Sequence, residues 1–183
     1  FTTPGAYAKA DEIIALGHVV KRYGGGYFTH LRDESNTVFE AAQEAIDIGA
    51  ACGVHVQIVH LKLSGMDMWG RAGEMLALIE SARARGVSID VDEYPYTAGS
   101  NPLKNLLPQW VQSGGVDAML ARLPEKETRA RIRSDIAREG LNNWGRIPGW
   151  DCVQISISPN LPQYAGRTIK ELNELIWAVQ NED

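Results

Sequence analysis

The first half of the chain alternates between two spacings of hydrophobic residues. Apolar residues three or four positions apart, as on one face of a helix, predict helices over residues 8–21, 38–49 and 75–82. Runs rich in β-branched residues predict strands over residues 27–30, 54–60 and 87–91. Gly53 and Gly86 follow the second and third helices, as glycines that end helices do. The pattern therefore predicts a regular alternation of helix and strand.

The predicted strand ends recur at a nearly constant interval. His30, His60 and Asp92 stand at or next to these ends, which gives spacings of 30 and 32 residues. One strand–helix unit of a parallel sheet takes about 30 residues or more, and right-handed crossovers bring the carboxyl ends of the strands to one edge. A doubly wound sheet and a (β/α)₈ barrel both fit. A complete barrel needs about 250 residues, so 183 residues hold only part of one.

The alternation stops after Ser100. Residues 103–111 are apolar and loop-like, whereas residues 125–139 show the pattern of a charged helix. Residues 152–158 alternate like a strand, and residues 168–179 return to helical spacing. We interpret the second half as a mostly helical insertion or subdomain.

Composition narrows the classes of function. The chain has 18 Lys and Arg against 23 Asp and Glu, and its net charge of −5 argues against nucleic acid or an anionic membrane as the main partner. The two cysteines, Cys52 and Cys152, argue against a disulfide-rich secreted domain. No apolar run approaches the roughly 20 residues of a membrane span. We expect a cytoplasmic protein and, because the chain opens with Phe1, a piece of a longer one.

Polar residues at the strand ends are the candidates for chemistry, because ligands of parallel α/β folds gather there. His30 and His60 hold equivalent positions on successive strands and could share one metal ion, or each could only cap its strand. Lys62 stands two residues after His60, so strand alternation is expected to point both side chains the same way. Lys62 could bind a substrate carboxylate or form a Schiff base, or it could be a solvated loop lysine. Tyr94 and Ser100 offer hydroxyls to a polar substrate. An ion-paired cluster of residues 32–34 is expected to orient His30.

Four motifs in order resemble the N-acyl-D-amino-acid deacylases (D-aminoacylases) of the amidohydrolase superfamily. They are YFTHLRDE at residues 27–34, IVHLK at 58–62, WGRA at 69–72 and DEYPYTAGS at 92–100. The resemblance is strong over residues 1–105 and weaker over 106–183, where the family has a variable stretch before its last barrel strand. It implies that residues 1–105 are the central part of a TIM-type barrel, about three consecutive βα units, and that residues 106–183 are the insertion.

The resemblance also implies a function. A parent enzyme would use Zn²⁺ to hydrolyse N-acyl-D-amino acids, its small-molecule substrates, to a carboxylic acid and a D-amino acid. His30 and His60 would bind the zinc ion, and Lys62, Tyr94 and Ser100 would bind the substrate. The family's other metal ligands and its proton-shuttling aspartate have no counterpart here, so this chain alone is expected to be inactive and to associate with the rest of its parent or with itself.

Three other functions stay open. A dihydroorotase- or hydantoinase-like amidohydrolase would open a cyclic amide, although the DEYPYTAGS motif disfavours it. A barrel lyase would use Lys62 as a Schiff-base amine. A scaffold domain would carry out no chemistry.

Overall fold

The computed structural model describes residues 5–180, so the ends of both predicted parts, residues 1–4 and 181–183, lie outside the described residues. The chain divides into two compact units, Phe1–Arg146 and Ile147–Asp183. The division at residue 105 stays a prediction.

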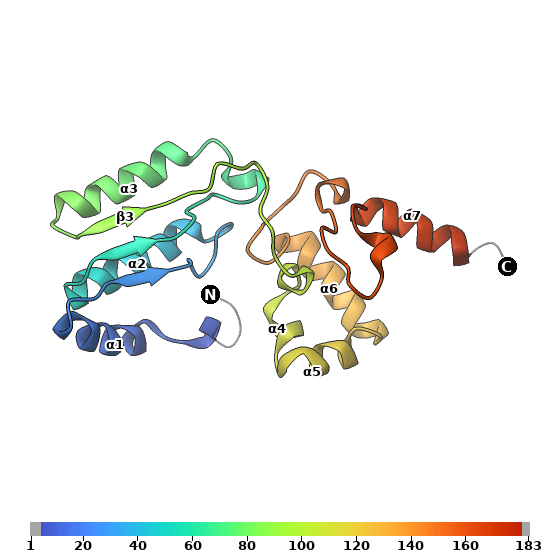
Figure 1. Cartoon of the computed structure of the whole chain (residues 1–183), viewed down its shortest axis with the longest axis horizontal. Helices are drawn as coiled ribbons and strands as arrows, with labels where there is room; N and C mark the ends of the chain where they lie inside the picture. Colours follow the sequence, from blue (N-terminus) through green and yellow to red (C-terminus); the bar gives the residue numbers. More distant parts are fainter. Residues whose placement is uncertain (1–4, 181–183) are drawn as a thin grey trace. The chain divides into compact units, whose positions relative to one another are not determined.

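A three-stranded parallel sheet organises the first unit (Figure 1). Its strands lie in the order β1 (Tyr27–Thr29), β2 (Val56–Ile58) and β3 (Ile89–Val91). The helices α1 (Ala10–Arg22), α2 (Val38–Cys52) and α3 (Ala72–Ala84) alternate with the strands along the chain. The predicted alternation of helix and parallel strand is confirmed, although each strand is shorter than predicted.

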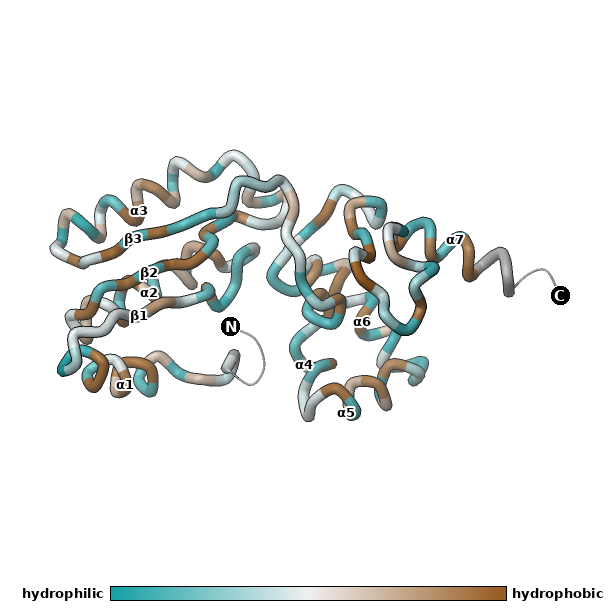
Figure 2. The backbone as a smooth tube through the Cα atoms, viewed as in Figure 1, coloured by the Kyte–Doolittle hydropathy of each residue, from teal (hydrophilic) through white to brown (hydrophobic). Residues whose placement is uncertain are grey.

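The apolar faces of α2 and α3 pack on one face of the sheet. The buried residues of this core include Val56 and Ile58 of β2, Ile46 of α2 and Ile79 of α3, and Figure 2 shows the hydrophobic colouring along β2 and β3. The approach is closest at Gly49, where an added Cβ would lie 2.0 Å from Val56 Cγ2. Glycine at this position therefore allows α2 to lie directly against β2.

The opposite face of the sheet carries a different set of side chains. Phe28 is 68% exposed, and Asp90, its counterpart on β3, is exposed as well. Each lies between one buried and one partly buried neighbour, because successive side chains of a strand point to opposite faces. Among the described residues, β1 and β3 each pair only with β2, so each leaves one strand edge unpaired.

The remainder of the first unit is helical. It contains the 3₁₀ helix η3 (Leu103–Leu106) and the α-helices α4 (Gln109–Gln112), α5 (Gly115–Arg122) and α6 (Lys126–Glu139). Val111, Met119 and Ile132 form its buried core. The charged helix predicted at 125–139 is confirmed as α6. The loop-like prediction for 103–111 is wrong in part, because η3 and α4 lie there.

The second unit contains η4 (Trp150–Cys152), η5 (Pro162–Tyr164) and α7 (Ile169–Gln180). The predicted helix over 168–179 is confirmed as α7, but the predicted strand over 152–158 is wrong. An isolated bridge joins Gln154 to Thr168, backbone hydrogen bonds of Val153 and Ile155 flank it without forming a strand, and Ile157 is 79% exposed. The alternating residues have no sheet to join, so the alternation produces no strand. Within residues 5–180, none of the helices combines the length and apolar character needed to cross a bilayer.

Candidate metal centre

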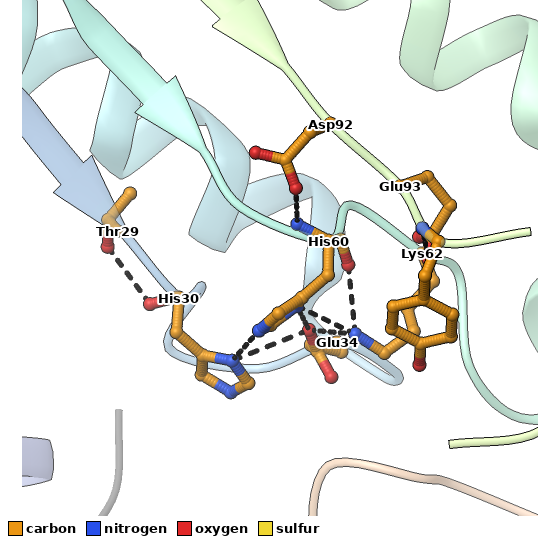
Figure 3. Close-up of polar contacts among 8 residues, drawn as sticks. Thr29, His30, Glu34, His60, Lys62, Asp92 and Glu93 are labelled. Carbon is orange, nitrogen blue, oxygen red and sulfur yellow. Dashed lines mark hydrogen bonds and ion pairs between the residues drawn. The ribbon is translucent and has the colours of Figure 1, made fainter. Parts of the chain in front are cut away.

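Two histidines meet beyond the carboxyl ends of β1 and β2 (Figure 3). His30 directly follows β1, and His60 lies two residues after β2. His30 Nδ1 lies 3.0 Å from His60 Nε2, and the rings meet edge to face with centroids 4.7 Å apart. The expected approach of the two imidazoles is therefore found, whereas their role as metal ligands stays a prediction.

The backbone of His60 is in the left-handed region, with φ of 41°. Few residues other than glycine adopt this conformation, and such strain is concentrated at functional sites. Asp92 stabilises it, since the His60 backbone N–H donates to Asp92 Oδ1 over 2.7 Å. The turn also redirects the side chain, which simple alternation from Val56 and Ile58 would send toward the helix-covered face.

Lys62 reaches the histidines by another route than the one expected. Strand alternation does not align its side chain with that of His60, because β2 ends at Ile58 and no strand continues through residues 59–64. Its side chain instead folds back over the turn. Lys62 Nζ lies 2.8 Å from His60 Nδ1 and donates to the His60 carbonyl over 2.9 Å.

Glu34, which the sequence places in the predicted cluster of residues 32–34, lies against the two histidines. It is 4% exposed, and its Oε1 accepts a hydrogen bond from Lys62 Nζ over 2.7 Å. The same oxygen lies 3.1 Å from His60 Nδ1 and 3.7 Å from His30 Nδ1. A buried carboxylate requires such partners, because leaving its charge uncompensated costs several kcal/mol.

The three acidic and basic residues after His30 do not form one cluster. Arg32 makes a two-point ion pair with Glu44 of α2. Asp33 accepts a hydrogen bond from the Thr37 backbone N–H at the start of α2. Only Glu34 turns toward the histidines, so the expected cluster of residues 32–34 is correct for Glu34 and wrong for its two neighbours, which hold the loop on α2.

Tyr94 lies beside this group, and Ser100 does not. The Tyr94 ring centroid is 6.4 Å from that of His60, and Lys62 Nζ lies 5.5 Å from the Tyr94 centroid. Burial raises the pKa of the Tyr94 phenol, with further contributions from Glu93 and Glu34, so the phenol keeps its proton at neutral pH. Ser100 is exposed, and no hydrogen bond of the described residues joins it to the histidines.

The electrostatics of His30 suit a ligand role. Burial, together with the positive charges of His60 and Lys62, lowers the pKa of its imidazole to about 4. The neutral imidazole is the form that binds metal ions. His30, Glu34 and His60 each offer one ligand atom, and these atoms lie within 4.8 Å of one another. Two imidazoles and a carboxylate are donors that suit Zn²⁺.

His55 provides a contrast. It precedes β2, at the opposite end of the sheet, and its Nδ1 lies 2.9 Å from Ser88 Oγ. Its Nε2 lies 3.8 Å from Asp90 Oδ2. His55 therefore contacts β3 and the residue before it, and these contacts do not involve His30 or His60.

The sequence is similar to characterised deacylases. Over 104 residues it is 42% identical to a D-aminoacylase of Alcaligenes xylosoxydans xylosoxydans, an alignment that covers 57% of this chain and 21% of the relative. An N-acyl-D-glutamate deacylase of the same organism is 33% identical over 100 residues, covering 55% of this chain and 20% of the relative. The chain thus spans about a fifth of the length of these relatives. No protein-family model matches it.

Solved structures agree with this relationship. A crystal structure of D-aminoacylase, described as defining a novel subset of amidohydrolases, matches 96% of this chain and 30% of its own with a TM-score of 0.63 and 26% identity. An N-acyl-D-glutamate deacylase from Bordetella bronchiseptica, complexed with zinc and a phosphonate inhibitor, matches 95% of this chain and 28% of its own. That match has a TM-score of 0.67 and 24% identity. The resemblance to N-acyl-D-amino-acid deacylases is therefore confirmed.

Proposed function

We propose that this chain is part of a zinc-dependent amidohydrolase that cleaves the amide bond of N-acyl-D-amino acids, giving a carboxylate and a free D-amino acid. The observation that carries the proposal is the convergence of His30, Glu34 and His60, with ligand atoms within 4.8 Å of one another, in a chain 42% identical to a D-aminoacylase over 104 residues.

The architecture we propose is part of a (β/α)₈ barrel. Residues 1–105 supply consecutive βα units, and residues 106–183 form the insertion before the last barrel strand. Two observations support this: the parallel order of β1, β2 and β3, and the exposure of Phe28 on the sheet face opposite the core. In a closed barrel that face turns inward and the strand edges are paired.

His30 Nδ1 and His60 Nε2 would hold the metal ion. Their 3.0 Å separation is close to the spacing of two nitrogens that each stand about 2.0–2.1 Å from one zinc ion. When bound, zinc polarises the amide carbonyl and lowers the pKa of a coordinated water to about 7. The positions of both histidines depend on the short loops after β1 and β2, and Asp92 fixes the second of these loops through the His60 backbone N–H.

Lys62, Tyr94 and Ser100 would bind the substrate. A free carboxylate next to the scissile amide is the common feature of N-acyl amino acids, and the Lys62 ammonium beside the histidines is a suitable partner for it. The protonated Tyr94 phenol can donate a hydrogen bond to the acyl or carboxylate oxygen. Ser100 needs a closer approach of its loop to take part, because its side chain is exposed.

The paired state of Lys62 disfavours a Schiff-base lyase. A Schiff base requires a neutral amine with a free lone pair. Lys62 Nζ instead donates to the buried Glu34 carboxylate and to the His60 carbonyl, so this nitrogen is already engaged within the cluster. The facing nitrogens of His30 and His60, 3.0 Å apart, likewise favour a metal enzyme over a scaffold domain.

The test is hydrolysis of N-acetyl-D-amino acids by the full-length protein that carries this sequence. Removing metal with a chelator should abolish turnover, and added Zn²⁺ should restore it. N-acetyl-L-amino acids and a cyclic dihydropyrimidine serve as comparison substrates. Turnover of the cyclic amide without turnover of N-acetyl-D-amino acids would overturn the proposal. So would zinc-loaded protein that hydrolyses neither the cyclic amide nor the N-acetyl amino acids. Borohydride trapping of a carbonyl substrate on Lys62 would support the lyase instead.

A further inference from the structure

We infer that Glu34 is a positioning residue, which sets the orientation and tautomer of His60 for metal binding and is not itself a metal ligand. This inference rests on the proposed metal centre. Its starting point is a single oxygen: Glu34 Oε1 lies 3.1 Å from His60 Nδ1 and 2.7 Å from Lys62 Nζ.

The tautomer of His60 decides whether the imidazole can bind a metal ion. A neutral imidazole carries one proton, so the nitrogen that binds metal must be bare and the other must hold the proton. The His60 nitrogen that faces His30 is Nε2. Metal binding at this point therefore requires the proton on Nδ1.

An N–H on His60 Nδ1 needs an acceptor, and its two charged neighbours differ in this respect. Lys62 Nζ, 2.8 Å away, is an ammonium that only donates. Glu34 Oε1 is a carboxylate oxygen that only accepts. Glu34 thus favours the tautomer that binds metal at Nε2, whereas Lys62 favours the opposite tautomer, in which Nδ1 is the acceptor.

The position of Glu34 fits a supporting role better than direct ligation. Its Oε1 contacts the Nδ1 side of the His60 ring, whereas the nitrogen that faces His30 is on the other side (Figure 3). Histidine ligands commonly donate their second N–H to a carboxylate, which fixes the ring and raises its basicity. Burial, with 4% exposure, keeps Glu34 in place. The ion pair with Lys62 offsets the cost of that burial.

Glu34 and Lys62 form one ion pair, but replacing each of them should affect metal affinity differently. Glu34→Gln keeps the shape of the side chain but removes the charge that selects the Nδ1–H tautomer. It should weaken metal affinity by about 10- to 100-fold, the range found for lost outer-sphere partners. Lys62→Met removes the competing donor and should leave metal affinity equal or tighter. A merely structural ion pair would weaken metal binding in both variants.

The experiment is titration of the metal-free full-length protein with Co²⁺, followed by visible absorption and by calorimetry. We expect the Glu34→Gln protein to bind as many Co²⁺ ions as the wild type, with the same absorption intensity and weaker affinity. Glu80→Gln, which removes an exposed ion pair with Arg83 within α3, is the control and should bind with wild-type affinity. An altered cobalt spectrum in Glu34→Gln would make Glu34 a ligand and overturn the inference.

Two further outcomes separate this inference from the proposed function. In the first, the wild-type protein binds Co²⁺ through His30 and His60, and the Glu34→Gln protein binds it with the same affinity. This result would overturn the role of Glu34 but not the proposed metal centre. Failure of the wild-type protein itself to bind Co²⁺ would overturn the proposed metal centre.

Discussion

His30 Nδ1 lies 3.0 Å from His60 Nε2, although 30 positions separate the two residues in the sequence. Two features produce this contact. The parallel pairing of β1 with β2 sets Thr29 opposite Ile58, so the chain leaves both strands at the same edge of the sheet. The left-handed backbone of His60, with φ of 41°, then turns its side chain toward His30.

Metal binding should depend on both of these histidines. His30→Ala and His60→Ala should each weaken Zn²⁺ affinity, because each removes a metal ligand. The loss should exceed about 10- to 100-fold, the range that removing an outer-sphere partner costs. His55→Ala, a histidine change at the opposite end of the sheet, is the control and should keep the affinity. Zinc content after dialysis of the full-length protein measures the effect. Wild-type zinc content in either alanine variant would remove that residue from the metal centre.

Lys62→Ala should separate substrate binding from metal binding. The ammonium that faces the histidines is lost, so KM for N-acyl-D-amino acids should rise by about tenfold or more, as expected for a charged hydrogen bond of about 1.5–3 kcal/mol. Zinc content should not fall. Lys104→Ala, a change of an exposed lysine, should alter neither. Loss of zinc from the Lys62 variant would instead place this side chain among the groups that hold the metal.

The contact between α2 and β2 should be sensitive to one added methyl group. Gly49→Ala would place a Cβ 2.0 Å from Val56 Cγ2, and such overpacking typically lowers the free energy of unfolding by about 1–3 kcal/mol. Gly73 of α3 has open space around it. Gly73→Ala should therefore be neutral or raise stability by up to about 1 kcal/mol. Urea unfolding midpoints compare the two, and equal midpoints would show that α2 shifts freely away from the sheet.

The fold of residues 8–91 could be predicted because local pattern and tertiary packing agree there. The helical spacing of α2 and α3 is the spacing of the residues that they bury on the sheet. Agreement fails elsewhere. Gly114 and Gly115, which precede and begin α5, both have positive φ and indicate a turn, so the short helix after them was not predicted. Residues 152–158 alternate without a neighbouring strand to pair with.

The sequence predicts only those residues of the site that lie at the ends of the strands. Spacing alone brings His30 and His60 to one edge of the sheet. The role of Glu34 depends on the path of the loop after β1, which Asp33 and Arg32 fix through contacts with α2. Periodicity carries no information about such a path. Lys62 was placed correctly for a wrong reason, since a turn and not strand alternation brings it to His60.

The α4–α6 part should lose stability at low pH through Asp135. A hydrogen bond from Trp110 Nε1, followed by the charges of Arg138 and Arg131, lowers the pKa of this carboxyl below its ordinary 3.8. A carboxyl with a lowered folded pKa stabilises the fold above its unfolded pKa and loses that contribution as pH falls through the folded pKa.

Asp135→Asn should therefore reduce stability at neutral pH and flatten its decline in acid. Unfolding free energies measured from neutral pH to below 3.8 test this, with Asp117→Asn, an exposed carboxylate of α5, as the control. Parallel pH curves for wild type and the Asp135 variant would contradict the assignment.

The 183-residue chain by itself should show no deacylase activity and should self-associate. Among the described residues, β1 and β3 each have one unpaired edge, and the sheet face between them carries Phe28 at 68% exposure. Unpaired edges and exposed apolar side chains favour association. Catalytic zinc sites normally have three protein ligands. Among residues 5–180, two histidines face the point where the metal would bind, because we infer that Glu34 contacts His60 from the other side.

Light scattering should therefore report particles larger than one chain, and Phe28→Ser should reduce their size. An assay of the purified chain with added Zn²⁺ against N-acetyl-D-amino acids should give no turnover, whereas the full-length protein should be active under the same conditions. Both measurements address the same cause, because barrel closure would cover the sheet face and complete the metal centre together. Sustained turnover by the 183-residue chain that disappears on His60→Ala would show that these residues already form a complete site.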